Sequence, residues 1–456
     1  MAEDWANRDD EAEASARLTA VREALHDSNA EALEALLEPL HPADIADLLE
    51  QIGQGEREQL LTLWRGGVDG DLLSEIDESI REEVIDFLPD DVVAEAVREL
   101  ETDDVVDILE DLDEPNQEKI LGALERADRV AVERAMGYPE YSAGRLMQRE
   151  VVVAPEHWTV GEAIDFLRGS DTLPDQFYHV ILLDPRMKPT GYVTLGRILS
   201  AARSTPLREI IEDSYRTVRA TDPEADVAYI FQQYHLISCP VVDENGRLVG
   251  VITIDDAMNV LDEEHEEDML RLAGVGDESS IQDGVFDTIK SRIPWLFINL
   301  LTANISALVI GQFESTIGQI VILAALMPII ASMGGIAGTQ SLTIAVRALA
   351  TRDLTVSNAM RVVRREAAVG AINGLSFAIL MGLAGWLILG LPMLGVVLAL
   401  AMVINLCVAA LAGILVPLAL DRMGFDPALA SGTFVMTVTD VVGFFAFLGL
   451  ATVMLL

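Results

Sequence analysis

Apolar residues recur at intervals of three and four along the first 138 residues, as in the segments ADIADLLEQI, REEVIDFL and DDVVDILEDL. This spacing places the apolar side chains on one face of a helix. The segments HPADIADLLEQI, PDDVVAEAVREL and TDDVVDILEDL look like a degenerate repeat, and each opens with a helix start that contains aspartate. The pattern predicts a stack of helical hairpins, which gives an all-α superhelical N-terminal domain over residues 1–138.

The pattern changes over residues 139–262, where β-branched runs such as REVVVAP, YHVILLD and SCPVVDENGRLVGVITI appear. Asn245 and Gly246 separate two of these runs, which is typical of a hairpin turn. The order strand, helix, strand, strand, helix occurs twice, and GYVTLGRIL in the first copy corresponds to GVITIDDAM in the second. We therefore predict a tandem pair of α+β domains.

An acidic linker helix over residues 263–290 precedes five apolar segments, at 293–313, 317–346, 367–391, 393–420 and 427–456. Each segment reaches the ~20 residues that a membrane-spanning helix needs. The sequence thus predicts an α-helical membrane domain of five transmembrane helices over residues 291–456.

The second apolar segment, MPIIASMGGIAGTQSLT, is expected to be interrupted. Pro328 cannot donate a backbone hydrogen bond, and the glycines Gly334, Gly335 and Gly338 weaken a helix. A break would leave backbone carbonyls that face protein or a water-filled path. Close packing of helices through small residues is an alternative explanation for these glycines.

Charge is distributed very unevenly along the chain. The net charge is −43, yet residues 291–456 carry seven Lys or Arg and six Asp or Glu, so the first 290 residues carry −44. Such an acidic block repels nucleic acid and attracts cations, which argues against a nucleic-acid partner. A solvated acidic surface that only aids solubility is the alternative.

The order of charges along the chain also predicts the topology. The start, MAEDWANRDD, lacks the basic and apolar regions of a cleaved signal peptide. Five arginines lie between the second and third spans, namely Arg347, Arg352, Arg361, Arg364 and Arg365. Cytoplasmic loops are enriched in such residues, so we expect cytoplasmic N-terminal domains and a C-terminus outside.

Motifs for enzymatic chemistry are missing from the sequence. GxxxxGK[ST], GxSxG and HExxH do not occur, all six histidines precede the apolar segments, and Cys239 and Cys407 suggest neither a disulfide framework nor a thiolate site. We therefore expect no enzyme, and no site selective for zinc or copper.

Asp440 is the exception within the last apolar segment, which is otherwise uncharged. A charge in the bilayer centre costs at least ~2.5–3.5 kcal/mol, so such a residue is usually functional. Oxygen ligands suit Mg²⁺, which gives up its waters reluctantly. One carboxylate is few for a dication, and a homodimer with a pore on the two-fold axis would bring two together. The alternative is a protonated acid that is hydrogen-bonded to a neighbouring helix.

Together these features resemble the MgtE family of magnesium transporters over nearly the full length. The resemblance rests on the acidic segment HPADIADLLEQI, the tandem cystathionine β-synthase (CBS) pattern ending in PVVDENGRLVGVITIDDAM, the linker EEDMLRLAGV, and the membrane motifs MPIIASMGGIAGTQSLT, GFDPALASG and TVTDVVGFF. It implies a homodimeric, Mg²⁺-selective channel of the bacterial cytoplasmic membrane, which cytosolic Mg²⁺ closes.

The resemblance also implies site residues. The ion-path positions are Asp440, Met436, Gly432, Gly335, Gly338 and Thr437. The regulatory Mg²⁺ positions are Asp90, Asp91, Glu95, Asp256, Glu264, Glu267, Asp268 and Asp426. CBS pairs often bind adenine nucleotides, and Thr253 with Asp256 fits the nucleotide pattern in the second copy, whereas the first copy has Thr194 with Arg197. ATP is therefore a candidate ligand of one site.

One position departs from the family pattern GGNxGxQ, because Ile336 stands where the asparagine is expected. Two alternatives to an Mg²⁺ channel stay open at this point. One is a broader transporter of Mn²⁺ or Co²⁺. The other is a membrane-anchored metal or nucleotide sensor that conducts nothing, which Ile336 favours and Asp440 does not.

Overall fold

The computed structural model describes residues 3–170, 173–174, 177–275, 284–355, 357–387 and 390–456. They form two compact units, residues 1–263 and 264–456, and each is described by itself. Part of the predicted linker, residues 276–283, lies outside the described residues.

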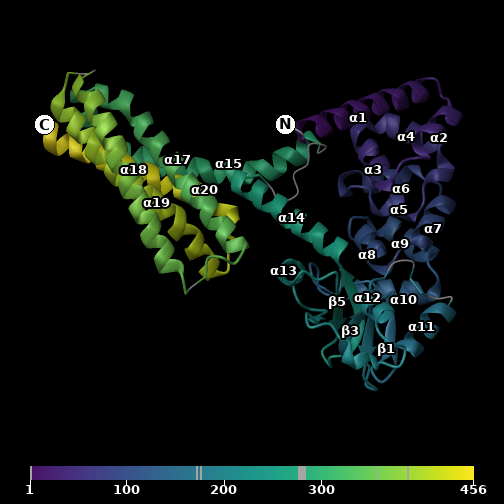
Figure 1. The fold of residues 1–456 in the computed structure, drawn as a ribbon. Helices are drawn as coiled ribbons and strands as arrows, with labels where there is room; N and C mark the ends of the chain where they lie inside the picture. The colour runs from purple at the N-terminus through teal and green to yellow at the C-terminus, as the bar shows by residue number, and fades with distance from the viewer. Residues whose placement is uncertain (1–2, 171–172, 175–176, 276–283, 356, 388–389) are drawn as a thin grey trace. The chain divides into compact units, whose positions relative to one another are not determined.

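Among the described residues, the first unit begins with ten α-helices that share one hydrophobic core (Figure 1). They are α1 (Glu3–His26), α2 (Ala30–Leu37), α3 (Pro42–Gln51), α4 (Gln54–Leu63), α5 (Gly70–Ser74), α6 (Glu78–Phe87), α7 (Asp90–Glu99), α8 (Thr102–Glu110), α9 (Glu114–Ala123) and α10 (Arg126–Ala135), with a 3₁₀ turn η1 (Arg65–Gly67). Helix α3 packs against α5, α5 against α7, and α7 against α9. In the same way, α4 packs against α6 and α8 packs against α10. This regular offset produces the superhelical stack that the sequence predicts.

Two small α+β modules follow in the same unit. The first contains β1 (Val153–Pro155), α11 (Val160–Gly169), β2 (His179–Leu183), β3 (Pro189–Thr194), α12 (Leu195–Ser200) and the turn η2 (Leu207–Glu209). The second contains β4 (Val218–Arg219), α13 (Glu224–Tyr234), β5 (Ser238–Val242), β6 (Leu248–Thr253) and α14 (Ile254–Ala273).

The two modules share one sheet topology. In each, the first strand pairs in parallel with the second, and the second pairs antiparallel with the third. The registers correspond, since His179 pairs with Thr194 as Ser238 pairs with Thr253. The predicted hairpin turn is present, and Gly246 has φ +75°, which a side chain would strain. These observations confirm the tandem α+β pair.

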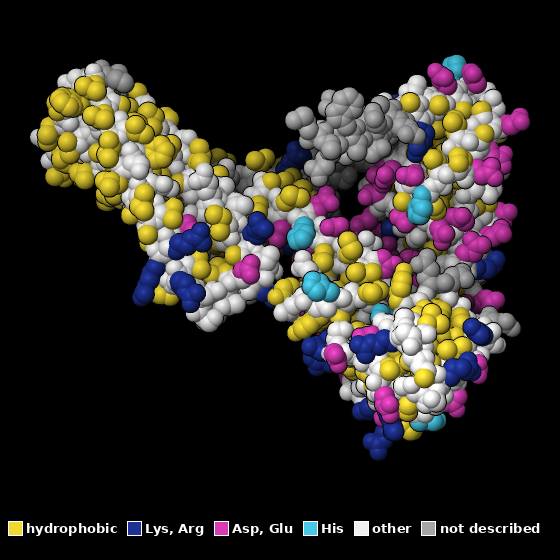
Figure 2. All heavy atoms as spheres, in the orientation of Figure 1, with side chains coloured by type: hydrophobic (Ala, Val, Ile, Leu, Met, Phe, Trp, Pro, Cys, Tyr) yellow, Lys and Arg dark blue, Asp and Glu magenta, His cyan; other side chains and the backbone are white. Residues whose placement is uncertain are grey.

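The second unit contains the C-terminal end of α14 and six further helices. They are α15 (Val285–Gly311), α16 (Glu314–Gln319), α17 (Ile322–Ala350), α18 (Ala359–Leu387), α19 (Pro392–Met423) and α20 (Pro427–Leu455). Five of them are long and apolar enough to cross a membrane, over Thr288–Gly311, Ile322–Ala350, Ala359–Leu387, Pro392–Met423 and Gly432–Leu455. Figure 2 shows acidic side chains over the N-terminal helices and mostly hydrophobic ones over these five.

Helix α19 is the centre of this bundle. It packs against α17, α18 and α20, and more than half of its apolar window is buried by the rest of the protein. The side chain of Asn405 on α19 is fully buried and donates a hydrogen bond from Nδ2 to the Ile330 carbonyl of α17 (2.8 Å). Gly334 of α17 and Gly443 of α20 both face this amide, and a methyl group added to Gly443 would lie 2.9 Å from Asn405 Oδ1.

The expected break in the second span does not occur, because α17 runs from Ile322 to Ala350 as one helix. Pro328 lies near its start, and the glycines serve close packing: Gly334 meets Asn405, and Gly338 meets Val435 of α20. Where no water is available, an unbroken helix satisfies backbone groups best. The small-residue packing that the sequence left as an alternative is therefore correct for Gly334 and Gly338.

Candidate cation path

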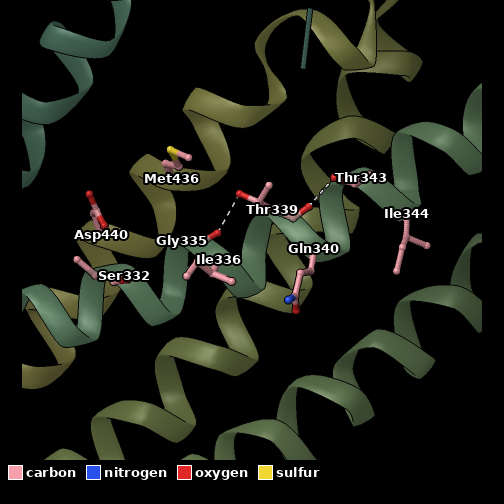
Figure 3. Close-up of a pocket in the computed structure, with 10 residues that line it drawn as sticks. Ser332, Gly335, Ile336, Thr339, Gln340, Thr343, Ile344, Met436 and Asp440 are labelled. Atoms are coloured by element: carbon pink, nitrogen blue, oxygen red, sulfur yellow. Dashed lines mark hydrogen bonds between the residues drawn. The ribbon is translucent and has the colours of Figure 1, made fainter. Parts of the chain in front are cut away.

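A groove of about 840 Å³ lies between α17 and α20 in the second unit. Its lining residues are Ala331, Ser332, Gly335, Ile336, Thr339, Gln340, Thr343 and Ile344 of α17, and Met436 and Asp440 of α20. Figure 3 shows Ser332 and Asp440 towards one end, and Thr343 and Ile344 towards the other.

The spacing of residues on α17 creates this groove. Its lining positions recur at three and four residues, so they form one face of the helix. The opposite face carries Gly334, Gly338 and Leu342, which are buried against the neighbouring helices. The sequence thus gives α17 a packed face of mostly small and apolar residues and an accessible face on which polar and apolar residues alternate.

Asp440 supplies the one carboxylate among the lining residues, and its side chain is half-buried. Met436 precedes it by one turn on α20, and Ser332 of α17 lies at the same end of the groove. A carboxylate beside hydroxyl, amide and carbonyl oxygens offers the hard ligands that Mg²⁺ prefers, directly or through its waters.

The threonine hydroxyls on α17 have a fixed orientation. Thr339 Oγ1 donates to the Gly335 carbonyl and Thr343 Oγ1 donates to the Thr339 carbonyl, each at 3.0 Å (Figure 3). Because each hydroxyl proton is used within the helix, the lone pairs of its oxygen are left for a donor or a cation. These hydroxyls therefore act as acceptors towards the groove.

The structure brings together three of the six predicted ion-path residues, namely Asp440, Met436 and Gly335. The other three lie elsewhere. Gly338 packs against Val435. Thr437 Oγ1 donates to the Thr433 carbonyl (2.7 Å). Gly432 faces the end of α14, where a methyl group added to it would lie 3.7 Å from the Leu272 carbonyl.

Sequence reasoning missed four polar lining residues, Ser332, Thr339, Gln340 and Thr343. The available signal was the helical period of polar residues in SMGGIAGTQSLT. It was lost once the segment was taken to be a broken helix, because a break removes the common face on which these residues lie.

Acidic residues also meet within the first unit, where the start of α8 approaches the start of α14. Asp103 of α8 is buried, and burial together with the nearby charges of Asp256 and Asp104 raises its pKa well above the usual value. The pKa of Asp104 rises from 3.8 to about 7, mainly through burial and then through Glu101. The pKa of Asp256 also rises to about 7, again mainly through burial, although Thr253 Oγ1 donates to Asp256 Oδ2 (2.7 Å).

These shifted pKa values predict that acid strengthens the contact between α8 and α14. Asp104 and Asp256 hold protons in this contact up to about pH 7, whereas hydrated carboxylates lose them near pH 4. Stability of the contact is therefore greatest at low pH and is lost as pH rises through 7. Limited proteolysis of the full-length protein in detergent, without divalent cations, should be slower at pH 5.5 than at pH 8. Equal rates at both values would contradict this assignment.

The predicted regulatory residues of α7 lie on its exposed surface. Asp90 forms an ion pair with Lys119 Nζ (2.7 Å), and Asp91 and Glu95 are exposed. Asp103 and Asp104, which do approach Asp256, come from the next repeat, TDDVVDILEDL. Both repeats carry an Asp pair at a helix start, so the sequence alone did not distinguish them. The regulatory role of Asp90, Asp91 and Glu95 stays a prediction.

A third acidic group lies in the second unit, where the end of α14 meets the start of α20. Arg271 pairs with Glu267 (2.9 Å) and with Asp426 (2.8 Å), and Asp426 also caps α20 by accepting from the Ala428 backbone (2.7 Å). Burial, and then the charges of Asp426 and Glu264, raise the pKa of Asp268 to about 6. Sequence reasoning named these carboxylates but missed Arg271, a cation already present among them.

Among the residues that the structure describes, no three His, Cys, Asp or Glu side chains are placed to hold one ion together. Pairs of carboxylates with bridging waters remain suited to Mg²⁺, which commonly uses one or two carboxylates and keeps several waters.

The predicted nucleotide residues occupy corresponding positions in the two CBS-like modules. Thr253 bonds to Asp256 in the second module. In the first, Thr194 Oγ1 donates to Glu212 (3.0 Å) and Arg197 pairs with the same carboxylate (2.9 Å). The second module thus keeps a Thr–Asp pair, whereas an arginine stands in the corresponding place of the first.

The architecture defines a multi-pass membrane protein that carries a helical domain and a CBS pair before its membrane helices. Family models agree with this. Residues 327–450 match MgtE, a divalent cation transporter, residues 40–141 match the MgtE intracellular N domain, and residues 143–204 and 207–263 match the CBS domain.

Whole-chain relatives identify the family. The chain is 32% identical over 441 residues to the magnesium transporter MgtE of Thermus thermophilus, covering 95% of this chain and 98% of that one. It is 26% identical over 428 residues to the magnesium transporter MgtE of Bacillus subtilis, covering 94% and 95%. A solved structure of the cytosolic domain of the Mg²⁺ channel MgtE in complex with ATP is 30% identical, covers 53% of this chain and 99% of that one, and has a TM-score of 0.49. The chain belongs to the MgtE family of magnesium transporters.

Proposed function

We propose that this chain is a channel that imports Mg²⁺ across the bacterial cytoplasmic membrane and that cytosolic Mg²⁺ closes it. The observation that carries the proposal is the groove itself: the Asp440 carboxylate, hydroxyl oxygens and the Gln340 amide share one accessible face between two membrane helices. The two whole-chain relatives named above are magnesium transporters, which supports Mg²⁺ as the cation.

The path is completed by a second copy of the chain. A groove that one chain leaves open becomes a closed path when the same face of a partner covers it, and two Asp440 carboxylates then balance one dication. The CBS modules support a two-fold pair as well. Leu199 and Met258, at equivalent places on α12 and α14, are both exposed apolar residues, as are Tyr178 and Ile237 just before β2 and β5.

The topology follows from the five spans. With the acidic domains in the cytoplasm, the connection from α17 to α18 is also cytoplasmic, and the C-terminus is outside. This connection includes Arg352, and Arg347 and Arg361 lie in the adjoining ends of α17 and α18. The C-terminal end of α17, beyond Thr343, therefore points to the cytoplasm, and Asp440 and Ser332 lie deeper along the path.

Closure by Mg²⁺ rests on the buried carboxylates. At low Mg²⁺, Asp103, Asp104 and Asp256 repel one another and weaken the contact between α8 and α14. Mg²⁺ that binds the closed arrangement more tightly than the open one shifts the population towards closure. At the end of α14, Glu267, Asp268 and Asp426 offer a second place for the same effect, and Asp426 leads directly into α20.

ATP is the proposed ligand of the second CBS module. The Thr253–Asp256 pair is suited to the hydroxyls of a ribose, because a carboxylate accepts from two adjacent hydroxyls. Since Asp256 also faces α8, nucleotide binding and Mg²⁺ binding would share one side chain.

The test of this function is gradient-driven uptake by the full-length protein in liposomes, with a fluorescent indicator for Mg²⁺ inside. We expect uptake when the acidic domains face low Mg²⁺ and suppression when they face high Mg²⁺. Competition with Mn²⁺ and Co²⁺ separates a Mg²⁺ channel from a broader transporter. An absence of uptake at low Mg²⁺ would favour the sensor.

A further inference from the structure

Apolar side chains lie among the polar ones in the groove lining, namely Ala331, Ile336, Ile344 and Met436. Ile336 of α17 is 56% exposed and Met436 of α20 is 47% exposed, and both line the groove. Figure 3 shows them between Asp440 and Ser332 on one side and Thr339 on the other. In a groove that also carries a carboxylate, hydroxyls and an amide, these two side chains offer a cation no hard ligand.

The face of α17 around Ile336 is open. A methyl group added to the neighbouring Gly335 would have no atom of the described residues within 4 Å. Ser332 and Gln340, one turn before and one turn after, belong to the same stripe of α17 and are both polar. The apolar section is therefore about one helical turn long, roughly 5 Å.

Polar groups on each side of this section can hold an ion. Asp440 and Ser332 lie before it, and Thr339 and Thr343 lie after it with their oxygen lone pairs available. Ser332 and Thr339 are seven residues apart, which corresponds to about 10 Å along the helix. A hydrated cation would therefore pass from one oxygen-lined place to the next across a stretch that offers it no ligand.

We infer that Ile336 and Met436 form an apolar barrier in the ion path that determines how fast hydrated divalent cations pass. The inference rests on the proposed function, including the second copy that would place the same two side chains opposite. Narrow apolar sections of a pore lose their water easily and then resist ions. Mg²⁺ is affected strongly, because it keeps its water shell and because the cost of leaving a polar environment rises steeply with charge.

The test replaces Ile336 by threonine and compares it with the same change at Ile372 of α18. Both isoleucines are more than half exposed, and threonine keeps the branched Cβ. Ile336 lines the groove, whereas Ile372 does not belong to its lining. We expect Ile336→Thr to raise Mg²⁺ uptake into liposomes about tenfold, the effect of one additional polar contact of modest strength, and Ile372→Thr to leave it within about twofold.

Two further measurements keep the inference testable. Ile336→Phe should lower Mg²⁺ uptake to less than about a tenth of wild type, since it lengthens the apolar section without adding a ligand. Uptake of K⁺, measured in parallel, should rise less than that of Mg²⁺ in Ile336→Thr. Equal rises for both ions would indicate a loosened pore and overturn the inference.

The outcomes also separate this inference from the proposed function. If wild type carries Mg²⁺ but the threonine variants at 336 and 372 behave alike, the barrier is wrong and the channel stands. If no variant and no wild-type protein carries Mg²⁺, the proposed function fails and the barrier fails with it.

Discussion

Asp440→Asn should reduce Mg²⁺ uptake at least about a hundredfold, because a charged group contributes up to about 3 kcal/mol to a hydrogen-bonded contact and asparagine supplies no charge. Asp440 is the one carboxylate among the groove-lining residues, and the other lining oxygens are neutral. In the proposed pair of chains, the substitution removes both charges that balance a dication. Gradient-driven uptake into liposomes measures the effect, and the purified variant should elute like wild type.

Asp421→Asn is the matched control. Asp421 is an exposed carboxylate near the end of α19, in the same unit and outside the groove lining. Its loss should leave uptake within about twofold of wild type, as for an ordinary surface substitution. Wild-type uptake by Asp440→Asn would make Asp440 a structural hydrogen-bonding group and would transfer the ion site to the hydroxyls of α17.

The double variant Asp104→Asn, Asp256→Asn should close at a lower Mg²⁺ concentration than wild type. Both carboxylates have pKa values near 7, so at pH 8 they are charged, buried and mutually repelling. Asparagine removes the repulsion and retains a polar side chain of similar size. We expect the Mg²⁺ concentration that half-protects the acidic domains from protease to fall at least about tenfold, since one pKa unit corresponds to a tenfold change. Uptake at low Mg²⁺ should fall with it.

The double variant Asp90→Asn, Asp91→Asn tests the same chemical change on the exposed surface of α7. Asp90 already has a cation partner in Lys119, so removing the two charges should leave the Mg²⁺ dependence of protection unchanged. If the α7 variant shifts the dependence and the α8–α14 variant does not, the regulatory contact lies at the residues first inferred from the sequence. A requirement for more Mg²⁺ in the α8–α14 variant would contradict the repulsion argument.

Local patterns accounted for most of the fold. Apolar runs located the five spans, the Asn245–Gly246 turn located a hairpin, and the repeated strand order located the two modules. Each of these depends on residues close together in sequence. Asp440 was also recognisable from sequence, because a lone charge in an apolar segment is conspicuous wherever the helices pack.

Long-range packing accounted for what the sequence did not reveal. Whether Pro328 and three glycines break α17 depends on Asn405. This residue binds the Ile330 carbonyl of α17 and lies 75 residues after it in the sequence. Arg271 and Asp426 are 155 residues apart, and their pairing depends on where α14 ends. The choice between the acidic pairs of α7 and α8 depends on the course of the superhelical stack. None of these relationships has a local signature.

The buried amide of Asn405 constrains how the channel can open. The described residues offer its Oδ1 no donor, and its Nδ2 is bonded to Ile330, so the side chain is held by close packing between Gly334 and Gly443. Separating α17 from α20 would expose this amide without water to hydrate it. The two helices that line the groove should therefore move together with α19 as a single rigid block. In the proposed pair of chains, opening is then a change in the distance between two such blocks, and the helix packing inside each block stays the same.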